Sequence, residues 1–218
     1  MKKFLLLVVL CCLFALPVQA SVRSENISGA NYKGQYPVVE AVNNKATAAI
    51  NRDLKTYVDK FVDALQNGTL LTKNKPDRLQ YVEGALSWEL YYEDEKVLSL
   101  VLTDYYYAGG AHGMHYDHGL VYDKITGQRK PLTDYVRITP FQLASEAHDN
   151  LYSLEKDGIK IETIWIGSVT RVPEDYFLLE DGTICPLFTL YELVPYASGS
   201  PCVHISPAKA RFYNKLNG

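Results

Sequence analysis

The residues best suited to chemistry are three histidines in one short segment that is rich in glycine. His112, His115 and His118 are three positions apart, and Asp117 lies next to the last of them. Imidazole and carboxylate groups are good zinc ligands, so one interpretation is a metal site built from His112, His115, Asp117 and His118. In an extended strand, however, side chains alternate between faces, which places His115 opposite His112 and His118. A metal-dependent hydrolase is therefore the alternative hypothesis.

Other catalytic patterns in the chain are less specific. Ser198 lies between Ala197 and Gly199, with His204 nearby, but the segment lacks the paired glycines of a nucleophile elbow. Carboxylates such as those at 93–95 fall at predicted turns, where acidic side chains usually face water. We therefore expect a binding protein that is not an enzyme and that needs no cofactor.

The chain is rich in tyrosine, with 17 among 218 residues. Three of them, at 105–107, run into Gly109 and Gly110, whose freedom to adopt positive φ permits a shaped turn. Tyrosine has a flat apolar ring and a polar hydroxyl, so exposed clusters favour binding of sugars or of a protein partner. Tyrosines in strands are also ordinary packing residues, and at least half of them are expected in the core or in cross-strand pairs.

The candidate ligand-binding residues come from two segments of the chain. Most lie in 105–118, and one follows Pro195 near the C-terminus. If the two segments lie side by side, their aromatic residues line one groove. The alternative is that these residues only shape a hairpin. The candidates are Tyr105, Tyr107, Gly109, Gly110, His112, His115, Tyr116 and Tyr196.

A long amphipathic helix is predicted in the N-terminal part of the chain. Apolar residues recur at steps of three and four from Val39 to Leu65, and the stripe ends at Gly68, a suitable C′ residue. The Tyr36-Pro37 pair is expected to precede this helix, after a short extended segment over 22–36. Because only one side of the helix is apolar, it must pack on a flat partner.

That partner is predicted to be an antiparallel β-sheet. Two runs rich in aromatic and β-branched residues, 79–93 and 96–107, flank Asp94-Glu95 and indicate a hairpin. A threonine N-cap, a proline at N1 and a glutamine at N3 in 139–142 open a second helix, expected to end near Lys156 and to pack on the sheet. The other expected elements are a strand over 118–123, a hairpin of 176–180 and 183–189 around Asp181-Gly182, a strand over 202–206 and a short C-terminal helix. Without a regular βαβ repeat, this order indicates an α+β fold.

The first twenty residues have the three regions of a secretory signal peptide. Lys2-Lys3 precedes an apolar run over 4–16, and Pro17 and Ala20 fit the cleavage region. The run is shorter than the ~20 residues that span a bilayer, so no stable membrane anchor is expected after cleavage. We expect a secreted or periplasmic protein with a single α+β domain over 21–218.

Charge and cysteine content agree with export. The formal net charge is −3 at pH 7, and lysines and arginines are scattered, so nucleic acid is not an expected partner. Only Cys185 and Cys202 remain after cleavage, and two thiols in an oxidising compartment predict one disulfide. Two separately buried thiols are the alternative.

Three stretches of the sequence resemble one family. They are 107–112, with 122–127 and 132–134 downstream, then 177–182, and finally 191–199. The pattern is similar to the extracytoplasmic domain of unknown activity shared by the anti-sigma factor RsiV and the polysaccharide deacetylase PdaC. The resemblance implies an α+β domain outside the cytoplasmic membrane. The signalling role of RsiV needs a transmembrane helix and the deacetylase role of PdaC needs a separate metal-dependent domain, so neither activity transfers. The two cysteines are not part of the pattern.

These observations together predict a non-catalytic domain that binds an envelope partner through residues 105–118. The partner is a cell-wall glycan or a protein such as a lysozyme-like enzyme. The alternative is a metal-dependent hydrolase that acts on cell-wall polymer.

Overall fold

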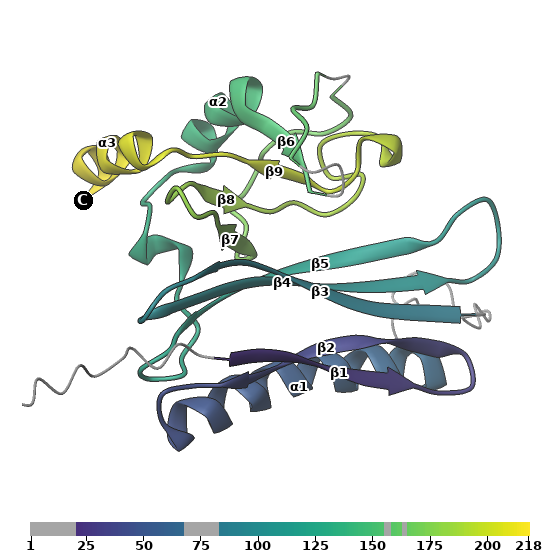
Figure 1. Cartoon of the computed structure of the whole chain (residues 1–218). Helices are drawn as coiled ribbons and strands as arrows, with labels where there is room; N and C mark the ends of the chain where they lie inside the picture. The colour runs from purple at the N-terminus through teal and green to yellow at the C-terminus, as the bar shows by residue number, and fades with distance from the viewer. Residues whose placement is uncertain (1–20, 68–82, 155–157, 163–164) are drawn as a thin grey trace, which may run out of the picture.

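The computed structural model describes residues 21–67, 83–154, 158–162 and 165–218. The predicted signal peptide, residues 1–20, lies outside the described residues. The described part has three layers: one long helix, a five-stranded sheet, and an upper layer of short strands and helices (Figure 1). The chain is therefore α+β, as predicted.

The sheet has the strand order β1-β2-β3-β4-β5. The strands are β1 (Ser21–Ser28), β2 (Tyr32–Glu40), β3 (Glu83–Glu93), β4 (Val97–Tyr107) and β5 (Met114–Asp123). Neighbouring strands are antiparallel except β2 and β3, which pair in parallel over 32–34 and 84–86. The prediction of a purely antiparallel sheet is therefore wrong. Helix α1 lies between β2 and β3 in the chain and carries it back across the sheet, and such a crossover makes strands parallel.

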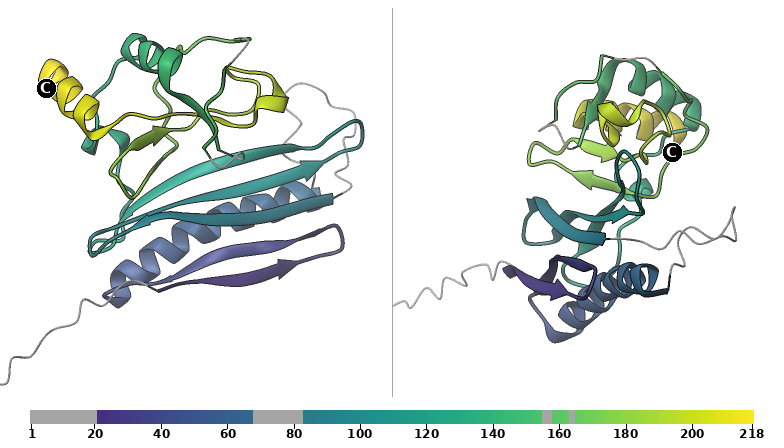
Figure 2. Two further views of the ribbon diagram at one scale, coloured as in Figure 1. Left: turned by 45° about the horizontal axis from the view of Figure 1, so that its top comes forward. Right: turned by 90° about the vertical axis from the view of Figure 1, so that its right-hand side faces the viewer.

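Helix α1 (Asn44–Asn67) follows two strands, so the prediction of an N-terminal helix after one short extended segment, with its stripe starting at Val39, is corrected. Pro37 and the buried Val39 lie in β2. The side chain of Asn43 accepts a hydrogen bond from the N–H of Ala46 at 2.8 Å, which caps the first turn. The apolar stripe then covers the lower face of the sheet, with Ile50 and Phe61 fully buried (Figure 2).

The predicted β3–β4 hairpin is confirmed. At its turn, the carboxylate of Asp94 accepts hydrogen bonds from the N–H groups of Lys96 and Val97, each at 2.7 Å. Lys124 is fully buried behind the turn and donates to Glu93 at 2.8 Å. The even-numbered residues of β4 face α1 and the odd-numbered ones face the upper layer, in the alternation expected of a strand covered on both sides.

The upper layer contains α2 (Pro140–Asn150), α3 (Pro207–Asn217) and two small sheets. One sheet pairs β6 (Leu151–Ser153) with β9 (Pro201–Val203), and the other pairs β7 (Tyr176–Leu178) with β8 (Ile184–Pro186). The 3-10 turns η2 (Leu132–Asp134) and η3 (Tyr196–Ser198) lie in the connecting segments. The capping box at Thr139 and the hairpin around Asp181-Gly182 are confirmed. Helix α2 ends at Asn150 rather than near Lys156, and its buried residues Leu143 and Ala147 belong to the core of the upper layer.

The predicted disulfide is absent, and Cys185 and Cys202 are buried as thiols. Two antiparallel backbone bridges set the register between β8 and β9. They join Ile184 to Ile205 and Leu187 to Cys202. In that register Cys202 lies diagonal to Cys185. Diagonal neighbours have Cα atoms roughly 7–8 Å apart, beyond the usual reach of a disulfide.

Within the described ranges, no helix combines the length and the apolar composition needed to cross a bilayer.

Candidate functional site

His112, Tyr191 and Tyr196 form an aromatic cluster at the end of the upper layer. The rings of His112 and Tyr196 stack with centroids 4.0 Å apart, and those of Tyr191 and Tyr196 are 5.7 Å apart. His112 Nδ1 donates to the carbonyl of Gly113 at 2.8 Å, so Nε2 of the neutral ring accepts from the Tyr191 hydroxyl at 3.2 Å. The two segments predicted to share a groove therefore lie side by side.

Tyr191 has an unusual backbone. Its φ is +65°, and it is the one non-glycine residue with positive φ among those described. The tight turn that creates this conformation is held by Glu192, whose carboxylate accepts from the N–H of Thr189 at 3.1 Å and from Arg171 at 2.9 Å. A tyrosine in the left-handed region costs on the order of 1–3 kcal/mol, and such strain clusters at functional sites. The exposed ring of Tyr191 is thus held in place against a backbone preference.

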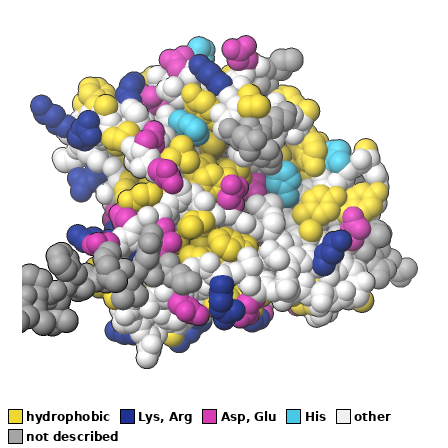
Figure 3. Space-filling model, viewed as in Figure 1, with side chains coloured by type: hydrophobic (Ala, Val, Ile, Leu, Met, Phe, Trp, Pro, Cys, Tyr) yellow, Lys and Arg dark blue, Asp and Glu magenta, His cyan; other side chains and the backbone are white. Residues whose placement is uncertain are grey.

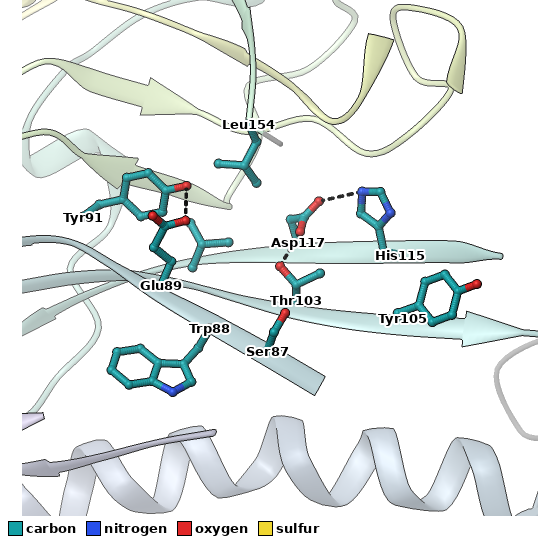
Figure 4. Close-up of a pocket in the computed structure, with 10 residues that line it drawn as sticks. Ser87, Trp88, Glu89, Tyr91, Thr103, Tyr105, His115, Asp117 and Leu154 are labelled. Atoms are coloured by element: carbon teal, nitrogen blue, oxygen red, sulfur yellow. Dashed lines mark hydrogen bonds and ion pairs between the residues drawn. The ribbon is translucent and has the colours of Figure 1, made fainter. Parts of the chain in front are cut away.

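A cavity of about 290 Å³ lies on the upper face of the sheet, and we name it the sheet-face cavity. Leu154 of the upper layer overhangs it, while side chains from β3, β4 and β5 form its floor and walls (Figure 4). The polar and aromatic lining residues are Ser87, Trp88, Glu89, Tyr91, Thr103, Tyr105, His115 and Asp117. His115 also approaches Tyr196, with ring centroids 6.4 Å apart, so the aromatic cluster adjoins the cavity at His115.

Asp117 organises the polar floor of this cavity. Its carboxylate accepts hydrogen bonds from Thr103 Oγ1 at 2.6 Å and from Ser200 Oγ at 2.5 Å. His115 Nε2 lies 3.4 Å from the same carboxylate and 3.2 Å from Ser200 Oγ. In a catalytic triad the acid and the serine bind opposite ring nitrogens, whereas here both lie at Nε2. Ser200 is buried and donates to the acid, so this arrangement positions His115 and does not activate a nucleophile.

His118 points to the opposite face of β5. Its Nε2 lies 3.1 Å from Asp104, and its ring packs against Tyr57 of α1 with centroids 4.7 Å apart. Burial alone would lower the pKa of His118, but the hydrogen bond and charge of Asp104 outweigh burial and raise it. Strand alternation thus separates His118 from His115, as the sequence pattern predicted.

The four residues of the metal hypothesis therefore occupy three places: the aromatic cluster, the sheet-face cavity and the α1 side of the sheet. Across 21–67, 83–154, 158–162 and 165–218, the structure shows no group of three or more His, Cys, Asp or Glu side chains arranged to hold a metal ion.

The remaining predicted site residues divide between shaping and lining. Tyr107 donates to the carbonyl of Gly110 at 2.9 Å, and Gly109 and Gly110 have φ of +90° and +107°, so these three shape the β4–β5 loop. Tyr105 lines the sheet-face cavity. Tyr116 packs against Tyr106 on the side of the sheet that faces α1, with ring centroids 6.0 Å apart, and does not line the sheet-face cavity.

Tyr191 of the aromatic cluster was missed, as were several residues that line the cavity, namely Ser87, Trp88, Glu89, Tyr91 and Thr103. Tyr191 opens one of the family-like stretches, so the pattern itself contained that signal. Glu89 and Tyr91 are two positions apart on β3, but only the pairing of β3 with β4, which sets Ser87 opposite Thr103 and Glu89 opposite Val101, brings this face of β3 to the cavity. His204, considered as a base, stacks on Tyr152 at 3.9 Å, and burial lowers its pKa.

The surface over this end of the molecule is apolar and aromatic. Figure 3 shows hydrophobic and histidine side chains side by side at its right, while lysines and arginines are dispersed. No basic patch accompanies the site on this face, in agreement with the scattered basic residues of the sequence.

Comparisons with known proteins agree with the predicted resemblance. Residues 24–115 match the family model described as deacetylase PdaC. Curated protein sequences contain no match to the chain. The matched region ends within β5, so it includes the stretch at 107–112 but not those at 177–182 and 191–199.

Two solved structures share the fold over nearly their whole length. A member of the DUF3298 family from Bacteroides fragilis is 15% identical, with 90% of this chain and 94% of that chain covered and a TM-score of 0.60. A DUF3298 family protein from Pseudomonas aeruginosa is also 15% identical, with 88% and 92% covered and a TM-score of 0.51. Residues 24–115 are therefore similar to the PdaC family model, and the described part of the chain has the fold of the DUF3298 structures.

Proposed function

We propose that this chain is a non-catalytic binding domain that works outside the cytoplasm and recognises a glycan of the cell envelope. The observation that carries the proposal is the contact of the sheet-face cavity with the aromatic cluster through His115. His115 belongs to the cavity and contacts Tyr196 of the cluster. The signal peptide predicted at 1–20 supports a place outside the cytoplasm.

The chemistry of the two parts suits a sugar chain. The flat rings of Tyr191 and Tyr196 offer apolar faces on which a sugar ring can stack, and their hydroxyls remain polar. In the cavity, Glu89 and Tyr91 hold each other through a hydrogen bond of 3.1 Å. Carboxylate and hydroxyl oxygens can exchange hydrogen bonds with sugar hydroxyls. At about 290 Å³ the cavity is at the small end of ligand sites, which fits one sugar ring.

A protein partner such as a lysozyme-like enzyme is the second candidate. Exposed tyrosines are enriched at protein interfaces, and Tyr191 is 45% exposed. The glycan is preferred because a protein interface does not require the polar cavity beside the rings.

The test is a binding comparison between two variants that each remove one aromatic ring, half-buried Tyr196 or exposed Phe212. Tyr196→Ala removes the centre of the cluster, and Phe212→Ala removes a ring that is 59% exposed on α3, far from the site in the chain. Cosedimentation with insoluble cell-wall glycan and titration with soluble chito-oligosaccharides are measured for both. We expect wild type and Phe212→Ala to bind alike and Tyr196→Ala to bind roughly 2- to 12-fold more weakly, since stacking on one ring is worth about 0.5–1.5 kcal/mol.

Two outcomes contradict the glycan proposal. One is the absence of glycan binding by folded wild-type protein. The other is saturable binding of a lysozyme-type enzyme, in a parallel titration, that depends on Tyr196 while glycan binding does not. The latter result would assign the cluster to a protein partner.

A further inference from the structure

A second and larger cavity lies where the α1 side of the sheet meets the upper layer. Its volume is about 640 Å³, within the range typical of small-molecule sites. Tyr57 of α1 and His118 of β5 line it, together with residues 129–133, 136, 138 and 172–175. We name it the interlayer cavity. It is distinct from the sheet-face cavity, because β5 separates the two.

Arg129 supplies the main polar group of the interlayer cavity. Its Nη1 donates to the Tyr57 hydroxyl and its Nη2 to the carbonyl of Gly119, both at 3.1 Å. Its Nε is buried and has no acceptor among the described residues. A guanidinium has five N–H donors, so the protein acceptors identified here leave this one unsaturated. The hydroxyl of Tyr57 accepts from Arg129 and keeps its own proton for a further acceptor.

Each basic side chain of the lining has a carboxylate nearby, and Arg129 Nη1 lies 3.7 Å from Asp53. Lys130 lies beside Arg129 and shares its ammonium group with Asp134 at 2.9 Å. Asp175 also lines the cavity and accepts from the N–H of Gly119. Burial raises the pKa of Asp175, although His118 and Arg129 act in the opposite direction. Arg129 Nε remains without an acceptor among the described residues, so this guanidinium is incompletely paired.

The rest of the lining is apolar. Leu132 and Val136 are buried, and Ile138, Val172 and two prolines continue the same wall. An apolar wall beside an incompletely paired guanidinium matches a ligand with a carboxylate at one end and a hydrocarbon body at the other. The planar fork of arginine fits a carboxylate in particular.

We propose that the interlayer cavity binds a small organic acid, with its carboxylate held by Arg129 and Lys130 and its branched hydrocarbon body against Leu132, Val136 and Val172. The carboxylate of Glu174 is exposed at the cavity and can accept hydrogen bonds from an amino group on the ligand. Amino acids therefore belong to the same class of ligand. The site is independent of the glycan proposal.

The test compares ligands that differ in charge but not in shape. 4-Methylpentanoate, its neutral amide 4-methylpentanamide, and L-leucine are titrated into the protein over residues 21–218 by calorimetry and by amide NMR shifts. We expect the carboxylate to bind at least about tenfold more tightly than the amide, because a hydrogen bond to a charged group is worth roughly that factor. Shifts are expected at Gly119, Arg129 and Val172.

Variants then locate the site. Arg129→Gln is expected to abolish binding and Lys130→Gln to weaken it several-fold. Arg137→Gln is the matched control, because this arginine lies on the same segment but does not line the cavity. Arg129 also braces Tyr57, so if its variant fails to fold, Ile138→Ser with Lys130→Gln decides the matter. Equal affinity for acid and amide, no saturable binding of either, or an equal effect of Lys130→Gln and Arg137→Gln would overturn the proposal.

Discussion

Replacing Gly119 with alanine is expected to push the upper layer away from β5. A Cβ at this position would lie 2.5 Å from both the N and O atoms of Tyr176, and 2.6 Å from its carbonyl carbon. All three are backbone atoms, which cannot rotate away as a side chain can. The N–H of Gly119 also donates to Asp175, and its carbonyl accepts from Arg129 at 3.1 Å. The substitution therefore strains one contact and disturbs two hydrogen bonds.

The expected cost is about 1–3 kcal/mol, the usual range for an overpacked core position. For a chain of this size, each kcal/mol lowers Tm by roughly 2–4 °C, so the fall should be between roughly 2 and 12 °C. The effect should be local, with the largest loss of amide-exchange protection in β5 and β7 and little change in α1.

Urea unfolding followed by tryptophan fluorescence and circular dichroism measures the cost. Gly109→Ala is the control, since a Cβ there would meet nothing within 4 Å and only the positive φ of +90° opposes it. That strain alone should cost roughly 1–2 kcal/mol and should leave protection in β7 unchanged. A Gly119→Ala protein with wild-type stability and unaltered protection in β7 would refute the close approach of Tyr176 to β5.

Four further predictions follow from particular groups. Burial alone would raise the pKa of Glu146, but the hydrogen bonds from Lys209 and Tyr213 outweigh burial and lower it. Glu146→Gln should therefore reduce the free energy of unfolding at pH 7, and the difference in unfolding free energy from wild type should shrink as the pH falls below about 4.5. A difference that grows on acidification would contradict this. Cys185 and Cys202 are buried, and burial raises the pKa of Cys185, so neither should react with a thiol reagent until the protein unfolds. If protein unfolded without a reducing agent does not show two reactive thiols, the cysteines form a disulfide instead. Elemental analysis of protein purified without added metal should find no stoichiometric zinc, and zinc lost on mutation of His115 would favour the hydrolase alternative. The exported protein should begin at Ser21, which N-terminal sequencing checks.

Local signals in the sequence predicted most elements of the fold. The capping box at Thr139 and the Asp181-Gly182 turn act within a few residues, so their structural meaning does not depend on distant contacts. The start of α1 was wrong because Val39 matches the spacing of the helical stripe, although it lies in β2. A residue at the right spacing can belong to either element, and only the pairing of β2 with β1 decides between them.

The candidate site was predictable only where alternation along one strand was enough. That rule placed His115 and His118 on opposite faces of β5. The contacts of His112 with Tyr191, and of Asp117 with Ser200, join residues about eighty positions apart. Such pairs depend on how the upper layer docks on the sheet, and no local pattern specifies that docking. The missing disulfide has the same origin, because a diagonal register between β8 and β9 cannot be seen in cysteine spacing.

Strand β5 links the two candidate cavities. His115 and Asp117 face the sheet-face cavity, and His118 faces the interlayer cavity. The backbone of Gly119 forms hydrogen bonds with both Arg129 and Asp175, which line the interlayer cavity. A small shift of β5 would therefore change both cavities. The carboxylate of Asp117 is held by a hydrogen bond from Thr103 on β4, so it should move less than Gly119 does. Gly119→Ala should for this reason impair binding of an organic acid in the interlayer cavity more than binding of a glycan on the sheet face, and the reverse order would show that the cavities are not arranged around β5 as described.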